Sequence, residues 1–436
     1  MNGIFVGTWS ITPYGETLHY ADEWIRHPSG RPLSRSLPFR PGNPLHTGQR
    51  VEAYFENLLP DSKEMRERIA RRYKTASTEA FDLLAEIGRD CVGALQLFPA
   101  HMQPASPGPV QATPLNESEV AHILRVVVTP PHLLGENEDD EDDFRISIAG
   151  AQEKTALLFY QGQWQKPKGV TPTSHILKLP LGLVGNMRAD MSSSVENEWL
   201  CSLILEAYGL PVARCEPMRF EDAKVLVVER FDRRWWGESS DYLLRLPQED
   251  MCQATGTPPG LKYENEGGPG VEDIMQLLQG SSHRNADRLL FFQSQVIFWM
   301  LCATDGHAKN FSIFLNQNDT FAMTPLYDVL SAYPILGAGP NKLSPFKAKM
   351  AMAVRLTNTH YKMREILRRH WIAIGERYGI VTPDGRPVAQ VLEDLVERTP
   401  AVIKAVRAQL PSDFPGQVAE PIFAGLQDAA NQLAGA

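Results

Sequence analysis

The stretch ATDGHAKNFS, residues 303–312, decides how the rest of the chain is interpreted. It directly follows DRLLFFQSQVIFWMLC, residues 287–302, a strongly apolar segment that is typical of a buried helix. The polar stretch is therefore expected to form a loop at the end of that helix. The loop presents two oxygen-bearing side chains, Asp305 and Asn310, with four residues between them.

Asp305 and Asn310 have the D-x-x-x-x-N spacing of the catalytic loop of protein kinases. In such a loop the aspartate accepts or orients the proton of the substrate hydroxyl, and the asparagine holds a magnesium ion. A short loop lets one side chain face the attacking hydroxyl while the other faces a metal ion that bridges the phosphates. By itself the pattern is more typical of a plain helix end, because Asp, Gly and Asn are common loop residues.

Three further residues strengthen the kinase interpretation. Asp328, in MTPLYDVLS, stands eighteen positions after Asn310, where kinases keep a second magnesium ligand. Lys178, in HILKLP, lies on a predicted strand, and a lysine amid a buried strand is costly unless it is paired. Glu198, on the helix predicted next, is a plausible partner for a lysine that clamps the ATP phosphates. The alternative for Lys178 is an edge-strand lysine that points to water.

The segment VVERFD, residues 227–232, runs from a predicted strand into a polar turn. Such a segment can offer main-chain groups to adenine, here from Glu229 to Phe231, with Asp232 near the ribose. A salt bridge between Glu229 and an arginine is an equal alternative on the sequence alone.

The segment RISIAGAQEK, residues 145–154, places Gly150 among small residues just before a predicted strand. It is neither a Walker A loop nor the G-x-G-x-x-G loop of protein kinases. The backbone amides of a small-residue turn can still cradle phosphates. A plain turn before a strand is the alternative.

The surrounding sequence predicts an α+β, two-lobed protein. Strands are expected at residues 154–160, 175–180 and 224–232, because these runs are apolar and bounded by turn signals. A helix over residues 193–208 interrupts them, with Ser193 and Glu196 fitting a capping box. The expected domains are an N-terminal α/β extension (1–100), a linker with an acidic loop (101–143), a strand-rich lobe (144–235) and an all-helical lobe (236–436).

Composition excludes several classes of protein. The chain has 436 residues, enough for two or three domains, and its 43% apolar and 22% charged residues are ordinary for a globular protein. Lys plus Arg number 43 and Asp plus Glu 52, so the net charge of −9 argues against DNA binding by bulk charge. Five scattered cysteines without a CxxC pair, no signal-peptide pattern and no apolar run near ~20 residues predict a cytoplasmic protein without a membrane span.

With these residues assembled, the chain resembles the HipA family of bacterial toxin–antitoxin kinases. The resemblance extends over most of the sequence. It rests on FENLLPDS (55–62), RISIAGAQEKTALL (145–158), KGVTPTSHILKLP (168–180), VERFDRR (228–234), RLPQEDMCQ (245–253), GGPG (267–270), ATDGHAKNFS (303–312) and PLYDVLSAYP (325–334). Several such strings in order make the match specific.

The resemblance implies a two-lobed serine/threonine kinase that uses ATP and Mg²⁺. Asp305 is the implied proton acceptor, and Asn310 and Asp328 are the implied magnesium ligands. Ser147 matches the serine that family members autophosphorylate, which would switch the kinase off by charge repulsion beside the ATP phosphates. The remaining implied nucleotide-binding residues are Ala149, Gly150, Ala151, Gln152, Glu153, Lys154, Lys178, Glu229, Arg230, Phe231, Asp232, His307, Ala308, Lys309 and Tyr327.

By family, the substrate is a translation protein, glutamyl-tRNA synthetase in the best-known case, and its phosphorylation arrests growth. A helix-turn-helix antitoxin, similar to HipB, is the implied partner, and with it the toxin acts as corepressor. The stretch in which relatives can touch operator DNA reads WIAIGERYG here, residues 371–379, with Glu376 and Gly379 where basic residues are wanted. We therefore expect DNA contact mainly through the antitoxin. The alternatives are a small-molecule or lipid kinase and an inactive corepressor binding module.

Overall fold

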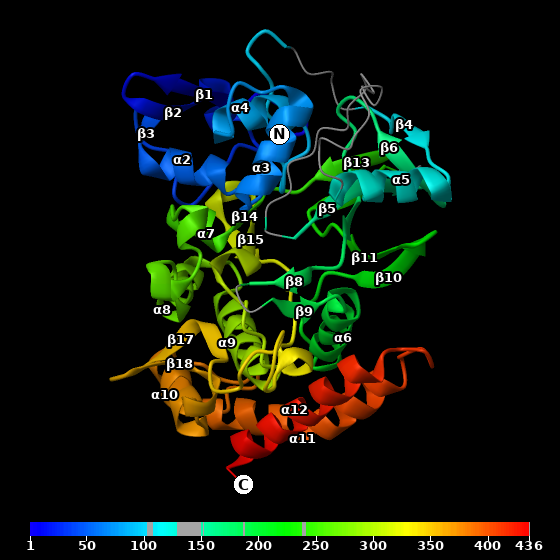
Figure 1. Ribbon diagram of the computed structural model, residues 1–436. Coiled ribbons are helices and arrows are strands. Elements are labelled where there is room, and N and C mark those ends of the chain that lie inside the picture. Colours follow the sequence, from blue (N-terminus) through cyan, green and yellow to red (C-terminus); the bar gives the residue numbers. More distant parts are fainter. Residues whose placement is uncertain (103–107, 129–149, 151, 186–187, 238–240, 436) are drawn as a thin grey trace. The chain divides into compact units, whose positions relative to one another are not determined.

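The computed structural model describes residues 1–102, 108–128, 150, 152–185, 188–237 and 241–435 of a mixed α+β protein (Figure 1). The chain divides into two compact units. Unit 1 comprises Met1–Leu179, Met218–Leu261 and Ser312–Thr320. Unit 2 comprises Pro180–Pro217, Lys262–Phe311 and Phe321–Ala436. Both units are discontinuous in sequence, whereas the domain ranges expected from the sequence are contiguous.

Unit 1 begins with a three-stranded antiparallel sheet in the order β1-β2-β3. Helices that follow this sheet pack on it around a core that includes Leu18, Trp24 and Phe55. Trp9 stacks on Phe55, with ring centroids 3.8 Å apart, and joins strand to helix. The elements are β1 (Gly7–Thr12), β2 (Gly15–Tyr20), α1 (Asp22–Arg26), β3 (His46–Thr47), α2 (Gln49–Glu56), α3 (Lys63–Tyr73) and α4 (Ala80–Ile87).

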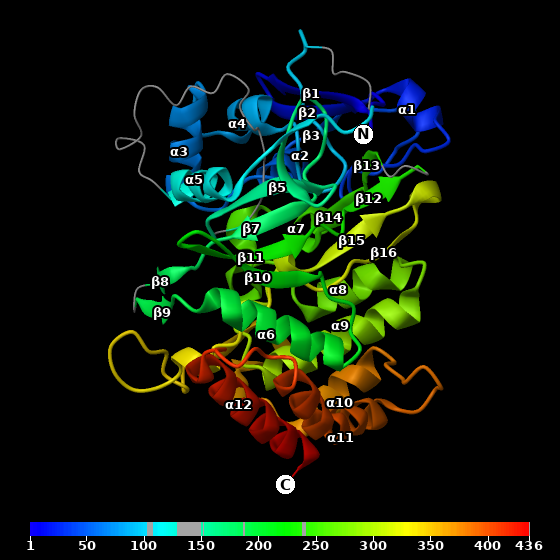
Figure 2. The ribbon, with the colours of Figure 1, turned by 90° about the vertical axis from the view of Figure 1, so that its right-hand side faces the viewer.

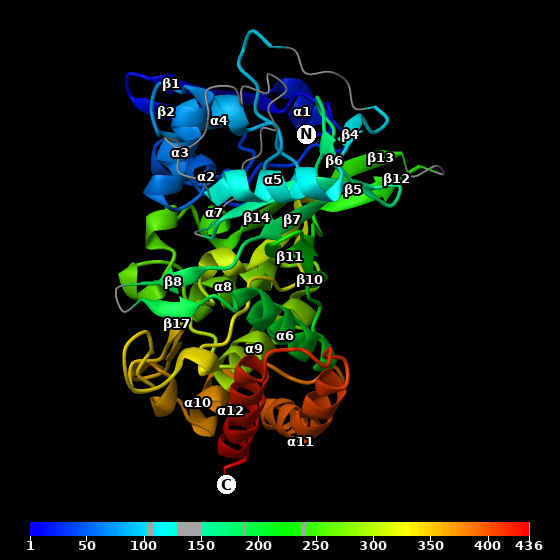
Figure 3. The same ribbon diagram turned by 45° about the vertical axis from the view of Figure 1, so that its right-hand side comes forward.

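A second sheet in unit 1 carries three of the predicted nucleotide-binding residues, Lys154, Lys178 and Glu229. Its strand order is β10-β11-β7-β5-β6-β4, and Figure 3 shows helix α5 lying along it. Leu124 of α5 packs with Leu157, Leu177 and Val227, which lie on three neighbouring strands. The elements are β4 (Ala112–Pro114), α5 (Glu117–Val128), β5 (Lys154–Tyr160), β6 (Gln163–Pro167), β7 (His175–Lys178), β10 (Cys215–Phe220) and β11 (Ala223–Glu229).

Short strands complete unit 1. β12 and β13 form one antiparallel pair, and β14 and β15 form another although they are more than sixty residues apart in sequence. The elements are β12 (Arg233–Trp236), β13 (Tyr242–Arg245), β14 (Gln248–Asp250), α7 (Met251–Thr255) and β15 (Ser312–Leu315).

Unit 2 is built mainly of helices (Figure 2). α11 and α12 pack against each other and against α6, and α12 also contacts α9, whose apolar face is buried. The elements are β8 (Gly182–Val184), β9 (Ala189–Met191), α6 (Ser194–Ala207), α8 (Val271–Leu277), α9 (Arg284–Met300), β16 (Phe321–Met323), β17 (Lys349–Arg355), β18 (Thr359–Lys362), α10 (Arg368–Arg377), α11 (Val388–Arg407) and α12 (Gly416–Ala434). Among the described residues, no helix has both the length and the apolar character needed to cross a bilayer.

The sequence located several of these elements, with two corrections. The strand predicted at residues 154–160 and the helix over residues 193–208 are confirmed by β5 and α6. The capping box is wrong, because the Ser193 side chain makes no cap bond and its ψ of 20° is not the extended conformation of a capping serine. The expectation of an all-helical segment over 236–436 is also wrong, since β13 to β18 lie in it. Short apolar runs do not distinguish buried strands from helices.

A buried carboxyl group in unit 1 predicts a dependence of stability on pH. Glu249 of β14 is fully buried, and its Oε1 accepts a hydrogen bond of 2.8 Å from Arg35 N. Burial raises the pKa of Glu249 from 4.5 to about 8, against smaller opposing effects of bonds to Ser34 and Arg35. The folded chain therefore keeps this proton up to about pH 8, while the unfolded chain loses it above its ordinary pKa of 4.5.

We expect the free energy of unfolding to fall as the pH rises from about 5 to 8, by up to about 4 kcal/mol from this group. Glu249→Gln, which resembles the protonated form, should lack this decline, as urea denaturation at several pH values would show. Glu23→Gln, at an exposed position of the same unit, is the control. Equal pH slopes for the parent and Glu249→Gln would contradict the prediction.

Candidate active site

The loop after α9 is held against that helix by aromatic packing in unit 2. Phe311, at the end of the loop, is buried and lies edge-on to Phe291 of α9, at 5.0 Å between ring centroids. Phe298 of the same helix packs on it at 5.7 Å. A Cβ added at Gly306 would lie 2.6 Å from the Phe298 ring, so only glycine allows the loop to approach this closely. The apolar helix predicted from the sequence is thus the platform of the loop.

Within this loop, one carboxylate faces solvent while its neighbours are buried. The Asp305 side chain is 60% exposed, whereas His307, Lys309 and Asn310 are buried. Asp305 O accepts a hydrogen bond of 2.8 Å from His307 N, and a single helical turn, Ala308–Asn310, follows. The turn presents the carboxylate outward, as a proton acceptor for a bound hydroxyl group requires.

The structure brings Asn310 and Asp328 together. Asn310 Nδ2 donates to Asp305 O at 2.8 Å and to Asp328 O at 3.5 Å, so one amide joins the two loops. Tyr327 makes a second link, because its hydroxyl donates to Lys309 O at 2.8 Å. Asp328 itself adopts φ +61°, an uncommon conformation for a residue other than glycine and one that marks a constrained position.

These residues fit a magnesium ion. The amide nitrogen of Asn310 is occupied by main-chain carbonyls, so its Oδ1 is the atom left for a cation, next to the loop of Asp328. Among the described residues no group of three His, Cys, Asp or Glu side chains could form a full metal cage. Mg²⁺ is usually bound by one or two protein oxygens, with phosphates and water supplying the rest. Asn310 and Asp328 match that arrangement.

The structure adds a residue that the sequence did not indicate. The Tyr263 hydroxyl donates a hydrogen bond to Asp305 Oδ1, and the Tyr263 ring lies edge-on to His307 at 5.0 Å. His307 Nε2 lies 3.9 Å from the same oxygen of Asp305. Tyr263 stands 42 positions before Asp305 and four before the GGPG string, and no spacing rule connects it to the loop.

In unit 1, two lysines face each other across neighbouring strands. The antiparallel register of β5 and β7 places Lys154 opposite Lys178, so both side chains leave the same face of the sheet. Lys178 is buried, and a Cβ at Gly150 would lie 2.6 Å from Lys154 Nζ. Like charges in directly opposed positions destabilise a sheet. Two lysines on one face of the sheet supply positive charge of the kind that binds phosphate, so this face is a candidate for the phosphates of a nucleotide.

The predicted phosphate-binding turn is partly described. Gly150 adopts φ +110°, which favours glycine, and its carbonyl accepts a 3.1 Å bond from Asp61 N. Gln152 Nε2 donates to Leu179 O at 2.6 Å, and Glu153 pairs with Arg68, so both side chains brace the turn. Three predicted residues, Ser147, Ala149 and Ala151, and the acidic segment 135–143 lie outside the described residues.

The predicted partners Lys178 and Glu198 belong to different units. Lys178 ends β7 in unit 1, and Glu198 lies on α6 in unit 2. Both side chains are buried, at 6% and 5% exposure, although isolated charged groups are rarely buried. Their pairing stays a prediction.

Asp232 and Arg230, which were expected to contact the nucleotide, lie in a buried network of ion pairs instead. Asp232 is 4% exposed, its Oδ1 accepts from Arg230 Nε at 3.0 Å, and its Oδ2 accepts from Gly93 N at 2.7 Å. The main chain of Arg230 is also engaged, with its N–H donating to Ser174 O and its carbonyl accepting from Arg233 N. Both residues thus belong to the buried framework, which corrects the expected contacts of Asp232 with ribose and of Arg230 with adenine. For the exposed Glu229 and the half-buried Phe231, main-chain contact with adenine stays a prediction.

This framework is an ion network with Asp90 at its centre. Asp90 accepts from Arg233 Nη2 and Arg245 Nε at 2.9 Å, from Arg230 Nη1 at 3.3 Å and from Thr173 Oγ1 at 2.6 Å. Burial alone would raise the pKa of Asp90, but the three arginines outweigh it and hold that pKa well below its ordinary value. The network ties the N-terminal extension to the six-stranded sheet within unit 1.

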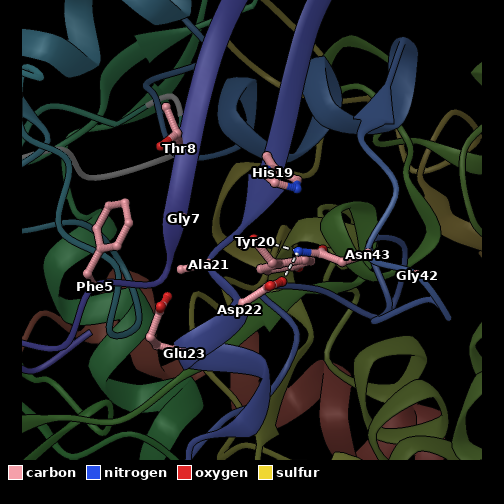
Figure 4. Close-up of a pocket in the computed structure, with 10 residues that line it drawn as sticks. All are labelled: Phe5, Gly7, Thr8, His19, Tyr20, Ala21, Asp22, Glu23, Gly42 and Asn43. Carbon is pink, nitrogen blue, oxygen red and sulfur yellow. Dashed lines mark hydrogen bonds between the residues drawn. The ribbon is translucent and has the colours of Figure 1, made fainter.

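A cavity of about 490 Å³ in unit 1 lies away from these residues (Figure 4). Asn43 Nδ2 donates to Tyr20 O and to Asp22 Oδ1 there, both at 2.9 Å. None of the residues predicted to bind nucleotide lines it. The lining residues are Phe5, Gly7, Thr8, His19, Tyr20, Ala21, Asp22, Glu23, Gly42 and Asn43.

Comparisons with known proteins show the family to which the chain belongs. Residues 1–98 match the HipA N-terminal domain and residues 146–403 the HipA-like C-terminal domain. The chain is 34% identical over 412 residues to "Putative kinase Y4mE" of Sinorhizobium fredii, which covers 90% of this chain and 91% of that protein. It is 26% identical over 369 residues to the serine/threonine-protein kinase toxin HipA of Shewanella oneidensis, which covers 81% of this chain and 77% of that toxin.

A solved structure has the same fold. It is the Shewanella oneidensis complex of HipA, HipB and operator DNA, in which the matched chain superposes with a TM-score of 0.77 at 22% identity and covers 100% of this chain and 97% of that one. Because the two domain matches span more than half of the sequence, and the 34% identical relative is aligned over most of its length, the chain belongs to the HipA family.

Proposed function

We propose that this chain is a serine/threonine protein kinase of a toxin–antitoxin pair, which transfers the γ-phosphoryl group of ATP to a protein. The observation that carries the proposal is the Asn310 amide, which joins the loops of Asp305 and Asp328 and leaves its Oδ1 for a cation. A proton acceptor and two oxygen ligands are thereby gathered within one unit. That arrangement suits in-line phosphoryl transfer, in which the protein positions the reactants and neutralises charge.

In the proposed reaction, the hydroxyl oxygen of a substrate serine or threonine forms a bond to the γ-phosphorus. The bond from that phosphorus to the β,γ-bridging oxygen breaks, and ADP leaves with the electron pair. The hydroxyl proton passes to the Asp305 carboxylate, which is exposed and so open to a substrate. Asn310 Oδ1 and Asp328 would hold Mg²⁺, which offsets phosphate charge when bound.

Residues of the six-stranded sheet in unit 1 would hold the nucleotide. Lys154 and Lys178 supply positive charge on one sheet face, and the turn that includes Gly150, Gln152 and Glu153 would cover the phosphates. Main-chain groups of Glu229 and Phe231 would contact adenine. The remaining residues of the catalytic loop, His307, Ala308 and Lys309, and Tyr327 would line the nucleotide site in unit 2.

The proposed partner is a helix-turn-helix antitoxin that binds operator DNA, as HipB does in the matched complex. Arg368 and Arg377 of α10 are paired with Glu393 and Glu272, so their charge is partly neutralised and supports no direct DNA contact. The proposed substrate is an aminoacyl-tRNA synthetase in the bacterial cytoplasm. Its phosphorylation would arrest growth.

Incubation with Mg-ATP tests the proposal. We expect the full chain to gain phosphate on the peptide that contains Ser147, because that serine precedes the predicted phosphate-binding turn. Ser147→Ala should lose this phosphate but still phosphorylate a foreign protein, since the serine is a substrate and no part of the catalytic loop. Intact-mass measurement and peptide mapping are the readouts. No phosphate in the parent on itself or on glutamyl-tRNA synthetase would contradict the proposed activity.

A further inference from the structure

The segment 262–270 of unit 2 is attached to the catalytic loop at one end. Lys262 O accepts a main-chain hydrogen bond of 3.3 Å from Ala308 N. The next residue, Tyr263, donates its hydroxyl to Asp305 Oδ1. The ring of Tyr263 is itself held, with Lys262 Nζ 5.5 Å above it and His307 edge-on at 5.0 Å. Two consecutive residues thus contact the loop that carries the proposed proton acceptor.

The same segment is anchored to β17 through Glu264. Its Oε2 accepts from Ala353 N at 2.5 Å, and its Oε1 accepts from Arg355 Nη2 at 2.7 Å. The Glu264 side chain is only 9% exposed, and a Cβ at Gly270 would lie 2.4 Å from its carboxyl carbon. Glycine at this position therefore makes room for the anchor. Charge-assisted bonds of this kind are stronger than neutral ones, so they fix the segment well.

The contacts of Asp305 distinguish its two oxygens. The Tyr263 hydroxyl donates to Oδ1, and His307 Nε2 lies nearest to the same oxygen, whereas Oδ2 makes no hydrogen bond with any described residue. An exposed carboxylate would otherwise rotate among rotamers, and holding it costs side-chain entropy. A hydroxyl donor on one oxygen selects one orientation in advance of substrate binding.

We infer that Tyr263 is a positioning residue that holds Asp305 Oδ1, so that Oδ2 receives the proton of the substrate hydroxyl, and that Glu264 anchors Tyr263 to β17. This inference rests on the proposed kinase function. Tyr263 exchanges no atom with the substrate and acts only through Asp305.

The test measures single-turnover incorporation of phosphate from radiolabelled Mg-ATP into the full chain. Tyr263→Phe should lower the rate constant at saturating ATP by about tenfold, with the half-saturating ATP concentration unchanged. Glu264→Ala should have a similar effect. The double variant should be no slower than the slower single variant, because both changes release the same contact.

Tyr208→Phe is the matched control, because the Tyr208 hydroxyl makes a buried 2.6 Å hydrogen bond to Thr399 in the same unit, far along the chain from Asp305. It should keep the parent rate. Equal slowing by Tyr263→Phe and Tyr208→Phe, or a parent rate for Tyr263→Phe, would overturn the role of Tyr263. Multiplying effects in the double variant would overturn the role of Glu264.

The two proposals fail in different ways. If Asp305→Asn is inactive while Tyr263→Phe has the parent rate, only the positioning role is wrong. If the parent incorporates no phosphate, or if Asp305→Asn matches an active parent, the proposed kinase mechanism is wrong and the positioning role falls with it.

Discussion

Asp305→Asn is expected to lower the rate of phosphoryl transfer by about a thousandfold or more, because it removes the group that accepts the substrate proton. Asparagine has the same shape, and its Oδ1 can still accept the hydrogen bond from Tyr263. The main-chain carbonyl of residue 305, which accepts from His307 N and Asn310 Nδ2, is unchanged. The loop should therefore keep its conformation while losing its base.

The measurement compares phosphate transfer and ATP affinity in the parent and in Asp305→Asn. ATP affinity should change little, because Lys154 and Lys178 are untouched. Asp384→Asn is the matched control, since Asp384 is an exposed carboxylate of the same unit whose partners are Thr382 and Arg386. A rate within about tenfold of the parent would exclude Asp305 as the proton acceptor.

Asp90→Ala is expected to destabilise the protein by about 3–5 kcal/mol, because it leaves buried arginines without their shared counter-ion. Asp90 and Asp232 together balance Arg230, Arg233 and Arg245, and all five side chains are buried. Removal of one carboxylate leaves a single negative charge among three positive ones.

The pH dependence of this effect has a definite sign. The pKa of Asp90 is lower in the folded chain than in the unfolded chain, so its contribution is present above its ordinary pKa and is lost as the pH falls. Urea denaturation at pH 7 and in acid should therefore show the difference between parent and variant shrinking in acid. Asp222→Ala, which breaks an exposed pair with Arg125, is the control and should change stability little. A similar small loss for Asp90→Ala would contradict the account of the network.

The sequence was most informative where one short segment carries the signal. The apolar run before Asp305 predicts the helix α9, and the run at residues 154–160 coincides with β5. The prediction of a capping box at Ser193 was wrong because the hydrogen bond of a capping side chain depends on the backbone conformation of the cap residue. The next residue, Ser194, uses its Oγ to accept a hydrogen bond of 3.0 Å from Leu181 N, which precedes α6 in the chain. The strands after residue 236 were missed because their pairing partners are distant in sequence, as β14 and β15 illustrate.

The same contrast applies to the candidate site. Asp305, Asn310 and Asp328 could be named from their spacing, because the chemistry of a catalytic loop requires oxygen-bearing side chains at short and regular intervals. The sequence could not show that Asp232 is a structural residue and not a nucleotide-binding one. Its partners Arg230, Arg233 and Gly93 N surround it only in the folded chain.

The sequence by itself determined the family, the helix before the loop, the strands β5, β7 and β11, and the residues proposed to transfer the phosphoryl group. Only the tertiary structure decided which oxygen of Asp305 is held, because Tyr263 reaches it across 42 positions and Glu264 reaches β17 across 89. The tertiary structure likewise decided that Asp90 gathers arginines from positions 230, 233 and 245. Local patterns record which conformations a segment prefers, whereas such contacts arise only when the burial of many distant apolar residues brings the polar groups together.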